Sequence, residues 1–372
     1  IIKLDHIELG SVLIEDGKIQ ELNPANYECN EVIDANGLFL SPGFIDIHIH
    51  GAGGYDTMDG TVDAIDSISK TIVKHGTTSF LPTTMTVSIE QINKSMHAIK
   101  ELKEKGTSGA QVLGAHLEGP FVSPSAIGAQ NPKYLLAPSI ETFNEMTAEC
   151  EDVVVSITLA PELNGSLNLI KHLSKKNINC SLGHTRATYE ETMEAIDAGA
   201  NHSTHLYNAM PPFNHRSPGI IGALFDSSKI TIETISDGIH ISYPALRIAY
   251  KQKSSDKSIL VTDAMMACCM PDGNYTLGGQ DVIVKDNAAR IKTGSLAGSV
   301  LTLDAAIRNV YNNCTMPLYE VVKMATYNPA KYCNVSDHKG LIKKGYDADL
   351  VLFDENINVK QVFINGKSIF NA

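Results

Sequence analysis

Three features that define other classes of protein are missing from this sequence. The seven cysteines are odd in number and contain no CxxC pair, so they do not form the pattern of a disulfide framework. No compact basic run occurs, and 30 basic against 42 acidic residues give a net charge of -12, which disfavours nucleic-acid binding. No apolar run approaches the roughly 20 residues that a membrane span needs. We therefore expect a soluble protein of the reducing cytoplasm that binds neither nucleic acid nor membranes.

The middle of the chain predicts a (β/α)8 TIM barrel. The whole chain has 372 residues, of which 43% are hydrophobic, enough for a sizeable core. Apolar β-rich runs alternate with polar stretches of helical periodicity, such as 89–105 and 187–199, which is the pattern of repeated βα units. A doubly wound sheet is the alternative. The expected strands are 43–50, 78–83, 112–119, 153–160, 180–185, 202–208, 230–237 and 258–265.

Both ends of the chain are rich in short strand-like segments. Asp16-Gly17 and Asn365-Gly366 are expected to form hairpin turns. The segment 31–40 has a similar pattern of short strands and turns. We expect residues 1–42 and 339–372 to pair into one small β-sandwich domain, with the barrel at 43–338 inserted between them. A β-hairpin excursion is expected at 274–294.

Metal-ligand side chains recur where the expected barrel strands end. His48 and His50 close the first strand, and residues two apart on a strand point the same way, so both imidazoles can hold one ion. Two hydrogen-bonded histidines would be the structural alternative. Active sites of barrel enzymes lie at the C-terminal strand ends, where further ligands accumulate. These are Glu118, His184, His205 and Asp263.

Several motifs together carry a resemblance to a known family. HLEGPF, LGHT, THLYNAMPP, SDGIH, TDAM, SLAGS and GLIKKGYDADLVLFD resemble the N-acetylglucosamine-6-phosphate deacetylases of the metal-dependent amidohydrolase superfamily, in family order. The resemblance implies hydrolysis of the acetamide of N-acetyl-D-glucosamine 6-phosphate. In that family a carboxylate at the Glu118 position replaces the bridging lysine of other branches. The strand 153–160 contains no lysine, which argues against a hydantoinase or dihydroorotase.

The chemistry of these residues assigns each a role. A divalent ion held by Glu118, His184 and His205 can lower the pKa of a water to near 7. Asp263 would act as the general base and then return the proton to the departing amine; a helix cap or an extra metal ligand is the alternative. His48 and His50 would provide a second site, with Glu118 bridging, so one or two ions of zinc, iron or manganese are expected per subunit.

The substrate-binding residues follow from the resemblance, position by position. It implies that Arg216 and His240 hold the phosphate and that the protein is a homodimer in which a phosphate-binding side chain crosses from the neighbouring subunit. A solvated surface arginine is the alternative for Arg216. Some members carry histidine at the Gln130 position. The residues expected around the sugar and acetyl group are Asn208, Ala209, Ala129, Gln130, Leu296, Ala297 and Gly298.

Other readings of the sequence remain open. The same chemistry on N-acetylgalactosamine 6-phosphate is the nearest rival, because motifs do not separate sugars that differ at one hydroxyl. Two further alternatives are a non-catalytic protein of the amidohydrolase fold and a nucleobase deaminase. Cys268 and Cys269 directly follow the strand 258–265; they fit small hydrophobic residues, with a redox role as the alternative.

Overall fold

Parallel strands that follow one another in chain order form the centre of the computed structural model, which describes residues 1–26 and 28–372. Strands β9 to β14 form a six-stranded parallel sheet, and β4, β7 and β8 form a second. Parallel bridges Thr83–His116 and Ile49–Ala264 connect the two sheets at both edges. The strands are β4 (Phe44–Ile49), β7 (Thr77–Pro82), β8 (Gln111–Val112), β9 (Ala115–Glu118), β10 (Val154–Leu159), β11 (Asn179–Leu182), β12 (His202–Ser203), β13 (Thr231–Ile235) and β14 (Ser258–Val261).

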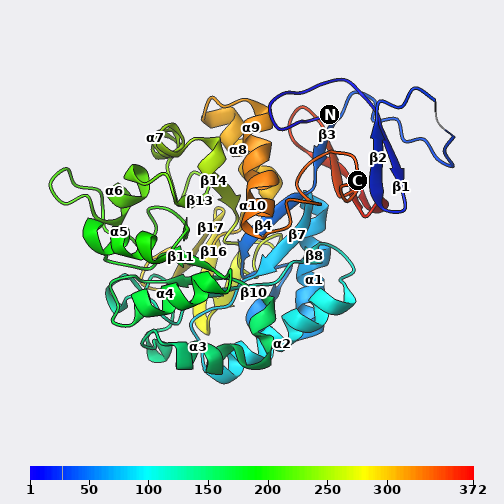
Figure 1. Ribbon diagram of the computed structural model, residues 1–372. Helices are drawn as coiled ribbons and strands as arrows, with labels where there is room; N and C mark the ends of the chain where they lie inside the picture. Colours follow the sequence, from blue (N-terminus) through cyan, green and yellow to red (C-terminus); the bar gives the residue numbers. More distant parts are fainter. Residues whose placement is uncertain (27) are drawn as a thin grey trace.

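Helices lie outside these strands, as the alternating pattern predicts (Figure 1). The predicted helix 89–105 is α2, whose first turn is capped by Ser88. Thr188 and Glu191 form a reciprocal capping box at the start of α5. The helices are α1 (Val62–Ile72), α2 (Ile89–Lys105), α3 (Ile140–Thr147), α4 (Ser166–Lys175), α5 (Tyr189–Ala198), α6 (Gly219–Asp226), α7 (Tyr243–Lys253), α8 (Leu303–Asn313), α9 (Leu318–Ala325) and α10 (Tyr327–Tyr332).

Several predicted strands are shorter in the structure, and two segments form a strand over only a few residues. The segment 202–208 is a strand only at β12, because the backbone then turns into the left-handed region at His205, Tyr207 and Ala209. In the segment 31–40, only the last residues enter a strand, β3 (Phe39–Pro42). In the segment 202–208 the apolar residue Leu206 is buried in a turn, whereas Val32 and Ile33 at the start of the segment 31–40 are exposed and outside any strand.

The chain ends lie side by side, on one flank of the parallel sheets (Figure 1). Strand β3 pairs antiparallel with β18 (Leu350–Phe353), which continues to β19 (Val359–Ile364) and β20 (Lys367–Asn371). The predicted turn Asn365-Gly366 joins β19 and β20. A hairpin of β1 (Val12–Glu15) and β2 (Lys18–Leu22) adds Ile19 to a separate small core with Leu350 and Phe363.

A three-stranded antiparallel sheet follows β14, where the sequence predicts a hairpin. It consists of β15 (Gly273–Leu277), β16 (Gln280–Lys285) and β17 (Ala288–Ile291). Gln280 donates from Nε2 to the Ala129 carbonyl at 2.5 Å, which ties this sheet to a loop beyond β9. A shorter hairpin of β5 (Gly51–Ala52) and β6 (Tyr55–Asp56) follows β4. Within the described part of the chain, no helix combines the length and apolar character needed to traverse a bilayer.

Candidate active site

Six polar side chains converge at the C-terminal ends of the parallel strands. His48 lies in β4 and Glu118 at the end of β9, while His184, His205 and Asp263 each lie two residues beyond a strand. These last three adopt left-handed backbone conformations, with φ of 46°, 26° and 49°. Such conformations cost on the order of 1–3 kcal/mol each and persist where the surroundings hold them. The whole set is buried: His48, His50, Glu118, His184, His205 and Asp263.

Glu118, His184 and His205 form the first ligand group. Glu118 Oε1 lies 3.1 Å from His205 Nε2 and 3.3 Å from His184 Nε2, and the two Nε2 atoms are 3.1 Å apart. His184 Nδ1 donates to the Ala126 carbonyl at 2.9 Å, so its Nε2 lone pair faces the centre. A cation between these atoms would satisfy two imidazole nitrogens and one carboxylate oxygen together. The donor set therefore fits a divalent metal ion.

His48, His50 and Asp263 form a second ligand group beside the first. His50 Nε2 lies 3.2 Å from Asp263 Oδ1 and 3.3 Å from Glu118 Oε2. His50 Nδ1 donates to the Thr83 carbonyl, so its Nε2 faces this group. His48 Nε2 is fully buried and makes no hydrogen bond, yet it lies 3.5 Å from Glu118 Oε1. Glu118 thus lies between the two groups, with Oε1 near His184, His205 and His48, and with Oε2 near His50.

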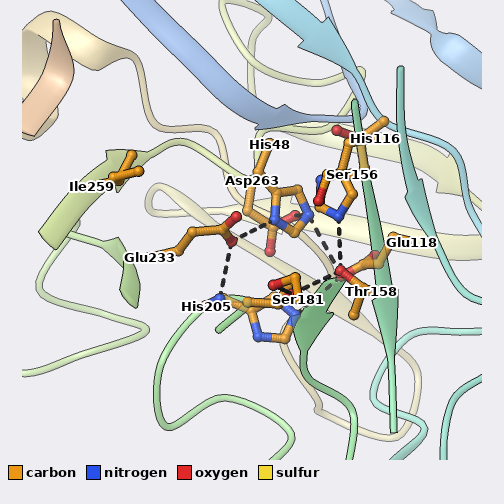
Figure 2. Close-up of polar contacts among 12 residues, drawn as sticks. His48, His116, Glu118, Ser156, Thr158, Ser181, His205, Glu233, Ile259 and Asp263 are labelled. Atoms are coloured by element: carbon orange, nitrogen blue, oxygen red, sulfur yellow. Dashed lines mark hydrogen bonds and ion pairs between the residues drawn. The ribbon is translucent and has the colours of Figure 1, made fainter. Parts of the chain in front are cut away.

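Glu233, which the sequence reasoning missed, contacts both His48 and His205 (Figure 2). Its Oε2 atom accepts from His48 Nδ1 at 2.9 Å and from the His205 backbone N–H at 3.1 Å. Its Oε1 atom accepts from His202 Nε2 at 3.0 Å. One carboxylate therefore orients both ligand groups. The available signal was a single acidic residue inside the apolar strand β13.

The buried charges stabilise one another. Burial opposes ionisation of His48, but Glu233, Asp263 and Glu118 outweigh it and raise its pKa to about 9. Burial likewise opposes ionisation of Glu118, whose pKa is nevertheless held well below its usual range by the charge of His48 and by hydrogen bonds from neighbouring imidazoles. The pKa of Asp263 is also lowered, against burial, by His48 and His50. Asp263 is therefore a carboxylate at neutral pH.

A cavity of about 280 Å³ opens onto both ligand groups. Gly298 lies in its wall at φ 60°, and a Cβ there would lie 3.0 Å from the Asp263 carbonyl oxygen, so this position favours glycine. Ala297 is buried beside it without lining the cavity. The other predicted substrate residues that line it are Ala129, Gln130, Asn208, Ala209, His240 and Leu296.

Gln130 contacts Glu118 directly. Its Nε2 donates to Glu118 Oε2 at 2.5 Å, and its Oε1 accepts from the Thr86 N–H at 2.8 Å. The amide is thus fixed at both ends and orients Glu118.

The two predicted phosphate ligands are placed differently. His240 lines the cavity, and its Nδ1 faces Asp237 Oδ2 at 2.6 Å. Arg216 lies on an exposed loop outside the cavity, where its Nη1 faces His215 Nε2 at 3.0 Å. Within one subunit, therefore, Arg216 does not join His240 in the cavity, although both were expected to hold the phosphate.

Comparison with known proteins gives the family. Residues 39–369 match the amidohydrolase family. The chain belongs to the amidohydrolase family. Amidohydrolases depend on metal ions, in agreement with the two ligand groups. The chain is 41% identical to an N-acetylglucosamine-6-phosphate deacetylase of Lysinibacillus sphaericus over 96% of this chain and 92% of that protein. It is 36% identical to an N-acetylgalactosamine-6-phosphate deacetylase of Escherichia coli O157:H7, covering 95% and 93%.

Solved amidohydrolase structures agree over nearly the whole chain. The N-acetylglucosamine-6-phosphate deacetylase of Pasteurella multocida superposes with a TM-score of 0.93 at 32% identity, covering 99% of this chain and 97% of that one. A mutant N-acetyl-D-glucosamine-6-phosphate deacetylase of Mycobacterium smegmatis, in complex with N-acetyl-D-glucosamine-6-phosphate, gives 0.92 at 31% identity, covering 97% and 95%.

We predict that Glu233→Gln weakens metal binding by about 10- to 100-fold, the usual effect of removing a carboxylate that orients ligating histidines. The amide would leave the His48 and His202 imidazoles without a charged acceptor. The measurement is metal affinity by competition with a chelator, with the far-ultraviolet spectrum as a check of folding. Unchanged affinity would show that Glu233 stabilises the strand ends only.

Proposed function

We propose that this amidohydrolase removes acetate from N-acetyl-D-glucosamine 6-phosphate and releases D-glucosamine 6-phosphate, in amino-sugar catabolism or cell-wall recycling. The observation that carries the proposal is the meeting of an ionised Asp263 with two metal-ligand groups in one cavity. The deacetylase relatives and the substrate complex of the M. smegmatis protein support it.

The proposed architecture is a closed (β/α)8 barrel at 43–338 and a small β-sandwich domain built from 1–42 and 339–372. The bridges Thr83–His116 and Ile49–Ala264 support closure, because they connect the edges of the two parallel sheets. The separate core around Ile19, Leu350 and Phe363 supports the sandwich. The barrel alone then carries the reaction.

Glu118, His184 and His205 would hold one divalent ion, and His48 and His50 would hold another beside Asp263, with Glu118 shared between the two. A bound ion supplies a Lewis acid for the acetyl carbonyl and lowers the pKa of a water. Imidazole and carboxylate donors suit zinc or iron(II), and manganese less tightly. Glu233 would orient His48 through a hydrogen bond, and Gln130 would orient Glu118 in the same way.

Asp263 moves the proton. Its carboxylate lines the cavity and is ionised at neutral pH, so it accepts the proton of the attacking water at Oδ1 or Oδ2. The same oxygen then gives that proton to the departing amine nitrogen. Asn208, Ala129 and Gln130 also line the cavity, where they would contact the sugar and acetyl group.

The direct test is acetate release from N-acetylglucosamine 6-phosphate and N-acetylgalactosamine 6-phosphate, with metal analysis of the same preparation. We expect a larger kcat/KM for the glucosamine substrate. A larger kcat/KM for the galactosamine epimer would show that the enzyme is an N-acetylgalactosamine-6-phosphate deacetylase instead. No acetate release from a metal-loaded protein would indicate a non-catalytic member of the family.

The number of ions is tested with a double variant. His48→Gln combined with His50→Asn removes both imidazoles of the second group and leaves Glu118, His184 and His205 intact. We expect about two ions per subunit in the wild type and one in the variant after dialysis, because the first group keeps three ligands. One ion in both proteins, with kcat unchanged by added metal, would show that the second group does not work as a metal site.

The proposal includes a homodimer in which Arg216 reaches the phosphate bound by the neighbouring subunit. The exposed position of Arg216, outside the cavity of its own chain, supports this arrangement. We predict that Arg216→Ala lowers kcat/KM about 10- to 100-fold for the phosphosugar, since a charge-assisted hydrogen bond contributes roughly 1.5–3 kcal/mol. Unphosphorylated N-acetylglucosamine is the control, and an equal loss with both substrates would contradict the assignment.

A further inference from the structure

A thiol, an imidazole and a carboxylate lie in contact outside the cavity, on the segment that follows Asp263. Cys269 Sγ is 3.3 Å from His75 Nε2, and His75 Nδ1 is 3.2 Å from Asp304 Oδ1. None of the three lines the cavity described above. The order nucleophile, imidazole, carboxylate is one that activates a thiol. We propose that Cys269, positioned by His75 and Asp304, is a modification site that reacts with small disulfides.

Three separate elements build this group. His75 ends a short helix before β7, Asp304 lies in the first turn of α8, and Cys269 follows β14 with a left-handed φ of 63°. Cys269 is exposed, whereas its neighbour Cys268 is buried, with its Sγ near the Leu301 carbonyl at 3.4 Å. A reagent in solution therefore meets Cys269 and not Cys268.

The charges around Cys269 favour its thiolate. The hydrogen bond from Cys268 and the neighbouring His75 lower the pKa of Cys269 to about 5, although burial opposes them. Burial disfavours charge on His75, but Asp304 outweighs it and raises the His75 pKa to about 10. Burial opposes ionisation of Asp304, but His75 chiefly lowers the pKa of that carboxyl, with a smaller contribution from Arg308, whose Nη2 lies 3.4 Å from Asp304 Oδ2. Cys269 and His75 therefore form a thiolate–imidazolium pair at neutral pH.

The reaction is a thiol–disulfide exchange. The Cys269 thiolate attacks one sulfur of a small disulfide, the disulfide bond of the reagent breaks, and a new bond joins Cys269 to the attacked sulfur. The other half leaves as a thiolate, which takes a proton from water. Cys269 is oxidised and the leaving sulfur is reduced, so the disulfide is the only co-reactant.

The chain supplies a matched control, because Cys29 is also exposed. The experiment uses folded Cys29→Ser protein, which keeps Cys269, and Cys269→Ser protein, which keeps Cys29, each mixed with dithiodipyridine at about pH 6. A thiol of pKa about 5 is mostly thiolate there, against well under 1% for an ordinary thiol of pKa about 8.5, while its intrinsic nucleophilicity is lower. Together these effects predict that Cys269 reacts about tenfold faster than Cys29.

Two further readouts separate activation from mere exposure. The rate of Cys29→Ser protein should stay nearly constant between about pH 6 and 8, whereas an ordinary thiol gains about tenfold per pH unit below its pKa. Adding His75→Asn to that protein should remove the advantage, and the pH profile stands without this variant if it fails to fold. Equal rates for the two thiols, an ordinary pH dependence, or an adduct mapped to another cysteine would each overturn the proposal.

Discussion

Replacing Asp263 by asparagine is expected to lower kcat by about 10²- to 10⁴-fold, the range that a positioned acid–base group supplies. The amide is nearly the same size, so the left-handed turn at φ 49° and the hydrogen bond from the Asp263 N–H to the His48 carbonyl at 2.8 Å should survive. What is lost is the oxygen that accepts the proton. The measurement is steady-state acetate release, with metal content determined on the same sample.

Two observations distinguish proton transfer from a ligand role for Asp263. If Asp263 also holds the second ion, the variant loses that ion and added metal restores part of the rate. If it only moves the proton, metal content is unchanged and added metal does nothing. Asp197→Asn is the matched control, since Asp197 is an exposed carboxylate paired with Lys229 on the outside of the fold, and it should keep the wild-type rate. Near wild-type turnover of Asp263→Asn would remove Asp263 from the mechanism.

The sequence was sufficient for those parts of the site that lie at the ends of regular strands. His48 in β4 and His50, directly after that strand, could be assigned to the same side because side chains of a strand alternate, and Glu118 is the last residue of β9. His184, His205 and Asp263 follow strands by two residues, so strand periodicity places them only near the site. Their orientation depends on left-handed backbone conformations, which local sequence does not specify for histidine or aspartate.

Contacts between segments that are distant in the sequence could not be predicted from it. The Glu233 carboxylate accepts hydrogen bonds from His48, His202 and the His205 backbone, which lie far from it in the sequence. No spacing along the chain indicates which carboxylate makes these contacts. The contact of Gln130 with Glu118 has the same origin, since a loop beyond β9 returns to the end of that strand. Arg216 shows the opposite case: its motif was recognisable, but its position in the exposed loop follows from tertiary structure.

Glu118→Gln should have a comparable effect through the metal ions. The Glu118 carboxylate lies near imidazole nitrogens of both ligand groups, 3.1 Å from His205 and 3.3 Å from His50. Glutamine offers one oxygen in place of two and has no charge to balance two cations. Its NH₂ group would also face either Gln130 Nε2 or the imidazole nitrogens, which are donors or metal ligands themselves.

We therefore expect Glu118→Gln to lose metal on dialysis and to show kcat reduced more than about 10²-fold, because Lewis-acid activation contributes several kcal/mol and each 1.36 kcal/mol is tenfold. Metal content and acetate release are measured together. Glu101→Gln, at an exposed carboxylate of α2 paired with Lys105, is the control and should match the wild type. A Glu118→Gln protein with full metal content and wild-type kcat would contradict the bridging role, because this carboxylate lies between the side-chain nitrogens of the two groups.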